Sequence, residues 1–256
     1  MAKSKSIHNK FKKHETFLDD IIINYDVKGE DYGNQDRNSL KLFKLEDKLL
    51  NVKSFRVPNL VNQIGYRFFR KSKAQRSFEY ANRLQSLDVK TPQPVAYYEY
   101  KSIFLFKKSY YISEQLNCDL TYRELTTDLD YPNHEAILRA FTRFTFSLHE
   151  KQVKFLDHSP GNTLIKKVGN DYEFYLVDLN RMEFKPMNFE ERIKNFAKLT
   201  INKSLIAVMS DEYAKCYNKP YQEVFNLMWH NTEEFQRRYW RRQRIKNKLK
   251  FWKPNL

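Results

Sequence analysis

The pattern of apolar and polar positions predicts two strands followed by a helix in the first third of the chain. The segments NSLKLFKL (38–45) and LLNVKSF (49–55) alternate as half-buried strands do, and the turn Glu46-Asp47-Lys48 separates them. Residues 72–87 have helical periodicity, and Ser72 can cap that helix. Its apolar stripe is formed by Phe78, Ala81, Leu84 and Leu87.

Two further strands are expected before the character of the chain changes. TPQPVAYYEY (91–100) is a proline-bounded entry into a strand. The segment SIFLFKKSYYISEQL (102–116) has two short apolar runs separated by Lys107-Lys108-Ser109. This separation predicts a hairpin turn at the triplet, with the second strand ending near Glu114.

After Leu116 the pattern becomes mainly helical. A helix is predicted over 133–151, with Ile137, Phe141, Phe144 and Leu148 on one stripe. A polar loop between short strands follows, and from Phe189 onward the chain reads as helical and basic. The order predicts an α+β protein in which a smaller β-rich lobe joins a larger α-rich lobe near residue 115.

The amino-acid composition predicts a buried core, and the net charge indicates an anionic partner. The 256 residues are 41% hydrophobic and 16% aromatic, which is enough to bury a sizeable core. The net charge of +15 exceeds the about 2 to 8 that solubility of a small domain needs. It therefore indicates nucleic acid, a phospholipid surface or a phosphorylated substrate, with solubility alone as the alternative.

Localisation signals are few. Cys118 and Cys216 lie far apart in no metal-ligand spacing, which argues against a disulfide scaffold or zinc site and suits a reducing cytosol. The short run Ile21-Ile22-Ile23 falls well below the roughly 18 apolar residues of a transmembrane span. The basic N-terminus has no apolar stretch after it, so we expect no secretory signal.

Two carboxylates and an amide mark the candidate chemistry. Asp157 is followed five residues later by Asn162, and a second carboxylate, Asp178, closes the apolar run Tyr175-Leu176-Val177. In phosphoryl transfer one Asp accepts the proton of the attacking hydroxyl, while an Asn and another Asp hold Mg²⁺. Oxygen ligands of this kind suit Mg²⁺. Ordinary turn residues are the structural alternative.

This segment resembles the catalytic loop and metal-binding strand of the protein-kinase-like superfamily, whose pattern in its sugar and small-molecule kinases is LHxxGVxHxDLxxxNIL. The resemblance makes Asp157 the catalytic Asp and gives Asn162 and Asp178 the two metal positions. His149 begins the motif as a structural histidine, and His158 belongs to the loop architecture. The sequence departs from the pattern at Gln152, at Phe155 and in the triplet Asp178-Leu179-Asn180.

The first lobe supplies the remaining parts that the resemblance implies. Lys53 takes the place of the strand lysine that contacts the α- and β-phosphates of ATP, and Glu79 that of its partner on the helix. Adenine would bind the backbone of Glu114-Gln115-Leu116. Gly29 and Gly33, in a GxxxG spacing, would form the loop over the phosphates. The lobes are then 1–113 and 119–256, with a hinge at 114–118.

Within the superfamily, the chain resembles the lipopolysaccharide core kinases (Kdo and heptose kinases) of Gram-negative bacteria. The resemblance rests on VKSFRVPN, SFEYANRL, FLDHSPGNTLI and VDLNR, the last ending at Arg181. It implies a Mg·ATP-dependent kinase that acts on inner-core sugars of a lipid A precursor at the cytoplasmic face of the inner membrane. Arg181 is a candidate for substrate phosphate or for loop support.

The basic, aromatic C-terminal tail, Phe235–Lys253, is the candidate contact with that anionic membrane. Packing of its rings on the second lobe is the alternative. No nucleic-acid partner is expected, and the sequence assigns no oligomeric state.

Other readings remain open at this stage. A kinase of the same fold acting on a small molecule or a protein is one, although a cationic acceptor would need an acidic pocket that the net charge disfavours. A non-catalytic basic module for RNA or membrane is another. Locally, Lys53 could be a solvated strand lysine, and Glu79 could pair with Arg76 or Arg83.

Overall fold

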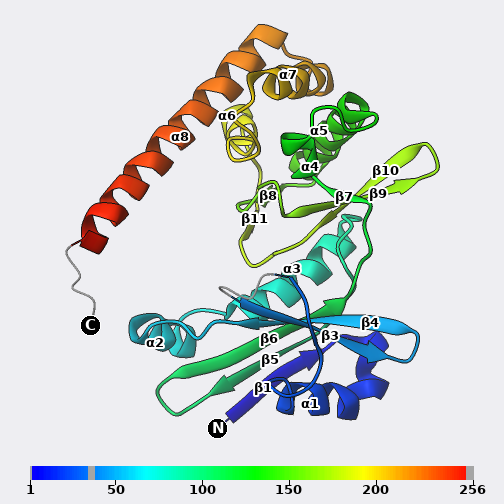
Figure 1. Ribbon diagram of the computed structural model, residues 1–256, viewed down its shortest axis with the longest axis vertical. Helices are drawn as coiled ribbons and strands as arrows, with labels where there is room; N and C mark the ends of the chain where they lie inside the picture. Colours follow the sequence, from blue (N-terminus) through cyan, green and yellow to red (C-terminus); the bar gives the residue numbers. More distant parts are fainter. Residues whose placement is uncertain (1, 34–37, 252–256) are drawn as a thin grey trace. The chain divides into compact units, whose positions relative to one another are not determined.

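The computed structural model describes residues 2–33 and 38–251 and divides into two compact units (Figure 1). The first unit comprises residues 1–117 and 175–181, and the second comprises residues 118–174 and 182–256. The short stretch 175–181 thus leaves the second half of the chain and returns to the first unit.

An antiparallel sheet of six strands forms the first unit, in the order β1-β5-β6-β4-β3-β2 (Figure 1). Its central hairpin, β3 and β4, pairs Asn38 with Phe55 and continues to Leu45 with Lys48, so the two predicted strands are confirmed. The strands are β1 (Ala2–Ile7), β2 (Glu30–Asp31), β3 (Asn38–Leu45), β4 (Lys48–Phe55), β5 (Pro94–Lys101) and β6 (Phe106–Glu114).

Helices cover both faces of this sheet, as the neighbours Tyr97 and Tyr98 illustrate, because successive strand residues point to opposite faces. Tyr98 is fully buried against α1 (Glu15–Ile23), where its hydroxyl donates to Asp19 at 2.9 Å. Tyr97 meets Phe78 of α3 (Lys73–Ser86), with ring centroids 5.5 Å apart. The expected α3 is confirmed together with its cap, since Ser72 Oγ accepts from Gln75 N at 3.0 Å.

The first unit also contains elements that the sequence pattern did not predict. Strand β1 pairs with β5 at the edge of the sheet, and a 3₁₀ turn (Asn9–His14) leads from it into α1. A further helix, α2 (Leu60–Phe68), lies between β4 and α3. The expectation of a single helix in this lobe was therefore too low.

The predicted hairpin turn at Lys107-Lys108-Ser109 was wrong. These residues lie inside β6, where Ser109 is buried opposite Phe55 and Lys108 binds Asp26 on the exposed side. The turn falls at 102–105, closed by the hydrogen bond from Ser102 N to Leu105 O at 2.8 Å. The apolar residues at its tip made the turn look like part of a strand.

The second unit is mainly helical. Its core gathers Tyr122, Phe141, Phe196 and Tyr213 with the aliphatic side chains of α5, α7 and α8. The helix predicted over 133–151 is confirmed as α5. The elements are β7 (Leu120–Thr121), α4 (Glu124–Thr127), α5 (His134–Glu150), β8 (Val153–Phe155), β9 (Thr163–Val168), β10 (Asp171–Leu176), β11 (Met182–Phe184), α6 (Phe189–Lys194), α7 (Lys203–Tyr217) and α8 (Tyr221–Phe251).

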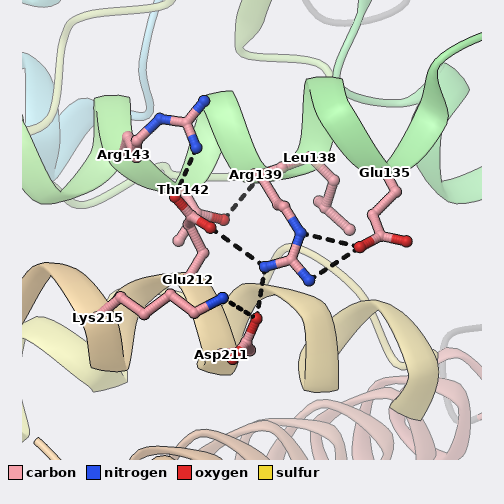
Figure 2. A network of polar contacts seen from close by, with 8 residues as sticks. All are labelled: Glu135, Leu138, Arg139, Thr142, Arg143, Asp211, Glu212 and Lys215. Carbon is pink, nitrogen blue, oxygen red and sulfur yellow. Dashed lines mark hydrogen bonds and ion pairs between the residues drawn. The ribbon is translucent and has the colours of Figure 1, made fainter.

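An ionic network fixes α5 against α7 (Figure 2). Arg139 binds Glu135 on its own helix at 2.8 Å and reaches Asp211 at 2.6 Å and Glu212 at 3.1 Å on α7. Arg143 adds a second cation on Glu212 at 2.5 Å. These cations hold the pKa of the Glu212 carboxyl below its usual value although burial opposes them. The network orients the helix that leads into β8 and the loop after it.

Helix α8 begins in the core and ends outside it. Val224, Met228 and Thr232 are buried, whereas residues 237–242 and 244–248 are exposed. The free half of the helix extends beyond α6 and α7 (Figure 1). The alternative in which the tail packs its rings on this unit is therefore wrong for these residues.

Candidate active site

In the first unit the strand lysine meets the second carboxylate of the motif. Lys53 Nζ of β4 binds Asp178 Oδ1 at 2.7 Å, and Asn180 Nδ2 donates to the same oxygen at 2.8 Å. The side chain of Lys53 is only 18% exposed, whereas Asp178 is 36% exposed. One carboxylate oxygen is thus held by two donors in a half-open position.

The chain geometry around Asp178 explains how it reaches Lys53. Leu176 N donates to Lys90 O at 3.1 Å, and Thr91 Oγ1 donates to Leu176 O at 2.8 Å, so the end of β10 is attached to the stretch before β5. Asp178 then has φ 56°, in the left-handed region that non-glycine residues seldom adopt. Leu179, which stands where regulated kinases have Phe, is buried.

Glu79 does not pair with Lys53. Its carboxylate binds Lys71 at 2.8 Å and Gln75 at 2.9 Å, and Lys53 binds Asp178. The expected Lys53–Glu79 ion pair is therefore corrected. Gln75 lies one helical turn before Glu79 and Lys71 lies just before the start of α3, so both partners are local.

The predicted hinge follows β6 directly. Glu114 binds Lys48 of the neighbouring strand, and Gln115 N donates to Leu49 O at 2.7 Å. Leu116 accepts a weak bond from the Gln115 side chain at 3.4 Å, and its own N–H has no partner among the residues described. A backbone donor therefore remains for a ligand at this position.

The two glycines flank the short strand β2. Gly29 has φ +85°, and a Cβ there would lie 2.5 Å from Phe43 Cζ, so both its backbone and its space require glycine. Gly33 has φ +67° and open surroundings. The four residues after it, 34–37, lie outside the described residues.

In the second unit Asp157 and Asn162 belong to one tight loop between β8 and β9. Asn162 Nδ2 donates to the backbone oxygen of Asp157 at 2.8 Å, and Asn162 N donates to Ser159 O at 3.0 Å. The first bond fixes the amide, so Oδ1 remains as an oriented oxygen with no protein donor among the described residues. Gly161 allows Arg123 to approach, since a Cβ there would lie 2.9 Å from Nη2.

Two residues that sequence reasoning did not identify hold this loop. Asn195 Nδ2 donates to Phe155 O at 2.9 Å, and Lys198 Nζ donates to Leu156 O. The Lys198 ammonium also lies 3.8 Å from Asp157 Oδ1. No spacing signal could have found them, because they follow the loop by some forty residues in an irregular stretch after α6.

Both histidines of the motif are structural, as predicted. Buried His149 shares hydrogen bonds with the Tyr213 hydroxyl at 2.9 Å and with Asn195 Oδ1 at 3.3 Å. Buried His158 stacks on Phe141 with a centroid separation of 5.4 Å. Burial lowers the pKa of His149 to about 4 and that of His158 to about 3, so both are neutral near pH 7.

Arg181 is exposed just before β11, at the end of the stretch that carries Asp178. The tail of the second unit lines a groove of about 640 Å³ along α8. Trp229, Trp240 and three arginines, Arg237, Arg241 and Arg244, are among its lining residues. The last part of the predicted tail, Trp252 and Lys253, lies outside the described residues.

The available donors suit a hard divalent cation. Asp178 offers carboxylate oxygens and Asn162 an oriented amide oxygen, which are ligands that Mg²⁺ accepts while it keeps several waters. Among residues 2–33 and 38–251, no group of three or more His, Cys, Asp or Glu side chains is placed to hold a metal ion. Over the same residues, no helix is both long and apolar enough to cross a membrane.

The comparisons place these features in a class of phosphotransferases. A sequence model of the lipopolysaccharide kinase (Kdo/WaaP) family matches residues 56–219, which is more than half of the chain. The chain belongs to this family, whose members are kinases that act on sugar hydroxyls of lipopolysaccharide. The expected family and enzyme class are thereby confirmed.

A solved structure supports the fold independently. The chain is similar to a structure described as "WaaP in complex with acyl carrier protein", with a TM-score of 0.64 and 17% sequence identity. The match covers 92% of this chain and 97% of that one. It confirms the α+β, kinase-like fold with a sheet-rich first part and a helical second part. No curated protein matches the sequence.

Proposed function

We propose that this chain is a Mg·ATP-dependent kinase that phosphorylates a sugar hydroxyl of the lipopolysaccharide inner core, Kdo or heptose on a lipid A precursor. The family supports a kinase of the lipopolysaccharide core that uses ATP. The observation that carries the finer proposal is the ion pair of Lys53 with Asp178, which joins two motif residues 125 positions apart.

Asp157 is the proposed base. The sugar hydroxyl transfers its proton to the Asp157 carboxylate as its oxygen bonds to the γ-phosphorus, and the bond from that phosphorus to the bridging oxygen breaks to release ADP. The loop bonds of Asn162 and Lys198 keep Asp157 in place, and the Lys198 ammonium offsets negative charge near the carboxylate. Mg²⁺, held by Asn162 and Asp178, would supply charge neutralisation for the phosphates.

Lys53 is the proposed partner of the α- and β-phosphates, and residues 114–118 are the proposed hinge between lobes 1–113 and 119–256. Two features support this. Lys53 is mostly shielded from solvent, and the Leu116 N–H has no partner among the described residues and is available to adenine. Gly29 and Gly33, which flank β2, are proposed to form the loop over the phosphates.

An acceptor attached to lipid A implies work at the cytoplasmic face of the inner membrane, as a peripheral protein. The exposed half of α8 supports such a contact, because Trp240 and Tyr239 stand among five arginines between 237 and 244. Aromatic rings favour the headgroup level, and cations attract anionic lipids. Arg181 is proposed to bind a phosphate of the acceptor.

The test is transfer of labelled γ-phosphate from Mg·ATP to a panel of Kdo-lipid A and core oligosaccharides. We expect transfer by the wild type and by Asp130→Ala, an exposed control, and none above background by Asp157→Ala. Transfer only to small molecules or proteins would assign another acceptor to the same fold. The absence of both phosphate transfer and Mg-dependent ATP binding would refute the proposed kinase. It would favour a basic RNA- or membrane-binding module instead.

A further inference from the structure

Helix α2 exposes its apolar residues and buries a polar one. Leu60, Val61, Ile64 and Phe68 lie within an arc of about 100° at about 100° per residue, and all four are exposed. The buried residue of the helix is Gln63, whose Nε2 donates to Pro58 O at 2.9 Å and whose Oε1 has no hydrogen-bond partner within the described part of the chain. A helix that packs on the core of a protein normally buries its apolar face and exposes its polar residues.

The inner side of α2 gives it little apolar packing. It faces a cavity of about 540 Å³ whose lining mixes polar residues, among them Asn59, Asn62 and Lys73, with the apolar side chains of Phe55, Val57 and Phe106. The helix is held mainly by Tyr66, whose ring lies 5.6 Å from that of Phe106, and by Arg67, whose Nε donates to Ser102 O at 3.0 Å. The apolar stripe of α2 is therefore not explained by the core of the unit.

The tip of the β5–β6 hairpin adds to the same surface. Arg67 Nε also contacts Ile103 O at 3.2 Å, which joins α2 directly to the tip. Ile103 and Phe104 are exposed there, and the turn is fixed because Ser102 Oγ accepts from Leu105 N at 3.0 Å. Phe69 follows Phe68 at a ring distance of 6.3 Å. In Figure 1 α2 and this hairpin lie next to one another in the first unit.

We call these residues the α2–hairpin surface: Leu60, Val61, Ile64, Phe68, Phe69, Ile103 and Phe104, exposed by 46% to 82%. With about 200 Å² for each Phe side chain, its three rings alone expose on the order of 400 Å². The largest apolar patch of a typical soluble monomer is about 300–600 Å² in total. Adding the four aliphatic residues takes the surface to the upper end of this range or beyond, so it indicates a binding face.

The positive charge around the surface indicates an anionic partner. Segments 56–76 and 100–108 contain nine Lys and Arg and no Asp or Glu. Some of these cations are engaged, since Lys71 binds Glu79, Lys101 binds Glu99 and Lys108 binds Asp26. Arg56, Arg67, Arg70 and Lys107 have no acidic partner among the described residues. Apolar side chains at fixed turns with cations beside them match the interface of an anionic bilayer.

We infer that the α2–hairpin surface inserts its apolar residues into the anionic membrane that carries the substrate. The contact lies in the first unit and is separate from the α8 tail. It rests on the proposed function only in the choice of a lipid partner, because a kinase of lipopolysaccharide meets its acceptor in a bilayer. Insertion would place the first unit at the headgroup level, with Arg70 and Lys107 able to reach lipid phosphates.

The first experiment measures binding of the full chain to vesicles of phosphatidylethanolamine and phosphatidylglycerol. We expect Phe68→Ser/Phe104→Ser to lower the bound fraction about tenfold or more, because both rings would lose their place in the acyl boundary. The control Leu129→Ser/Val168→Ser removes two exposed apolar side chains elsewhere and should leave binding unchanged. Thermal unfolding checks that both double variants fold.

A second measurement reports insertion itself. Phe104→Trp should show stronger fluorescence quenching by brominated acyl chains than the wild type, whereas Val168→Trp should show no more quenching than the wild type. Equal vesicle binding by the two double variants, or no added quenching at position 104, overturns the inference. Loss of self-association by Phe68→Ser/Phe104→Ser, with vesicle binding intact, also overturns it and assigns the surface to a second copy of the chain.

Activity separates this inference from the proposed function. Phe68→Ser/Phe104→Ser should phosphorylate a deacylated, soluble core acceptor at the wild-type rate and a vesicle-embedded acceptor more slowly. Vesicle binding that depends on these rings in a protein without kinase activity would uphold the surface and refute the kinase. Kinase activity together with vesicle binding that does not depend on these rings would uphold the kinase and refute the membrane-binding role of the surface.

Discussion

Replacing Lys53 by Met tests whether the ion pair with Asp178 serves catalysis or only the fold. Met keeps most of the length of the side chain and its apolar stem but removes the ammonium. The replacement ends the 2.7 Å contact with Asp178 and leaves the carboxylate with the amide of Asn180 as its donor among the described residues. It also removes the proposed contact with the α- and β-phosphates.

The two roles differ in expected magnitude. Asp178 is 36% exposed, so solvent screens the pair and its loss should lower stability by about 1 kcal/mol at most. For a chain of this size that corresponds to a change in Tm of roughly 2–4 °C. A phosphate contact that strengthens in the transition state should cost at least about 100-fold in kcat/KM, or about 2.7 kcal/mol.

The assay measures kcat/KM for phosphate transfer and Tm on the same preparations. Lys108→Met is the matched control, because Lys108 lies in the same sheet and binds Asp26 at 2.9 Å. We expect the control to keep its activity on a soluble acceptor. If Lys53→Met lost stability but kept its kcat/KM within a few-fold of the wild type, the pair would be purely structural and the reasoning wrong.

Two further predictions concern the second unit. The pKa values of His149 and His158 are about 4 and about 3 in the folded protein, below the usual 6.5, so the unfolded chain takes up protons first as pH falls. Each histidine should therefore lower the free energy of unfolding by about 2 kcal/mol when the pH falls from 7 to 5, as measured by urea unfolding. A free energy of unfolding that does not change with pH over this range would contradict the burial of both side chains as neutral groups. Arg139→Met should lower the free energy of unfolding by about 2 kcal/mol, since Glu212 is mostly buried beside it, while the exposed Arg238→Met should change it by less than about 0.5. Equal effects of these two arginine variants would show that the network of α5 and α7 is not stabilising.

Local patterns were sufficient where one face of an element is buried. Strands β3 and β4 alternate, and helices α3 and α5 repeat their apolar residues every three or four positions, so their bounds followed within a residue or so. The pattern failed at the β5–β6 hairpin and at α2, where apolar residues are exposed. Periodicity reports which residues are alike, and it does not report which way they face.

In the candidate site, too, some features could be predicted from the sequence and others could not. The candidate residues Lys53, Asp157, Asn162 and Asp178 could be proposed from the sequence, because phosphoryl transfer needs groups of these kinds on successive elements. The partner of Glu79 could not be read, since Lys53, Arg76 and Arg83 were the candidates and the carboxylate binds Lys71 instead. Lys198 was likewise invisible, because only folding carries it to the Asp157 loop.

The sequence by itself determined the family, the two kinds of secondary structure and the candidate residues proposed for the chemistry, because these depend on local periodicity and on fixed spacings. Only the tertiary structure decided which charges meet and which apolar residues remain outside. Lys53 meets Asp178 because the segment after β10 returns to the first unit. The α2–hairpin surface is exposed because Tyr66, on the opposite side of α2, packs against Phe106, while Arg67 ties the helix to the hairpin tip. Contacts of this kind join residues distant in the chain, and no local pattern encodes them.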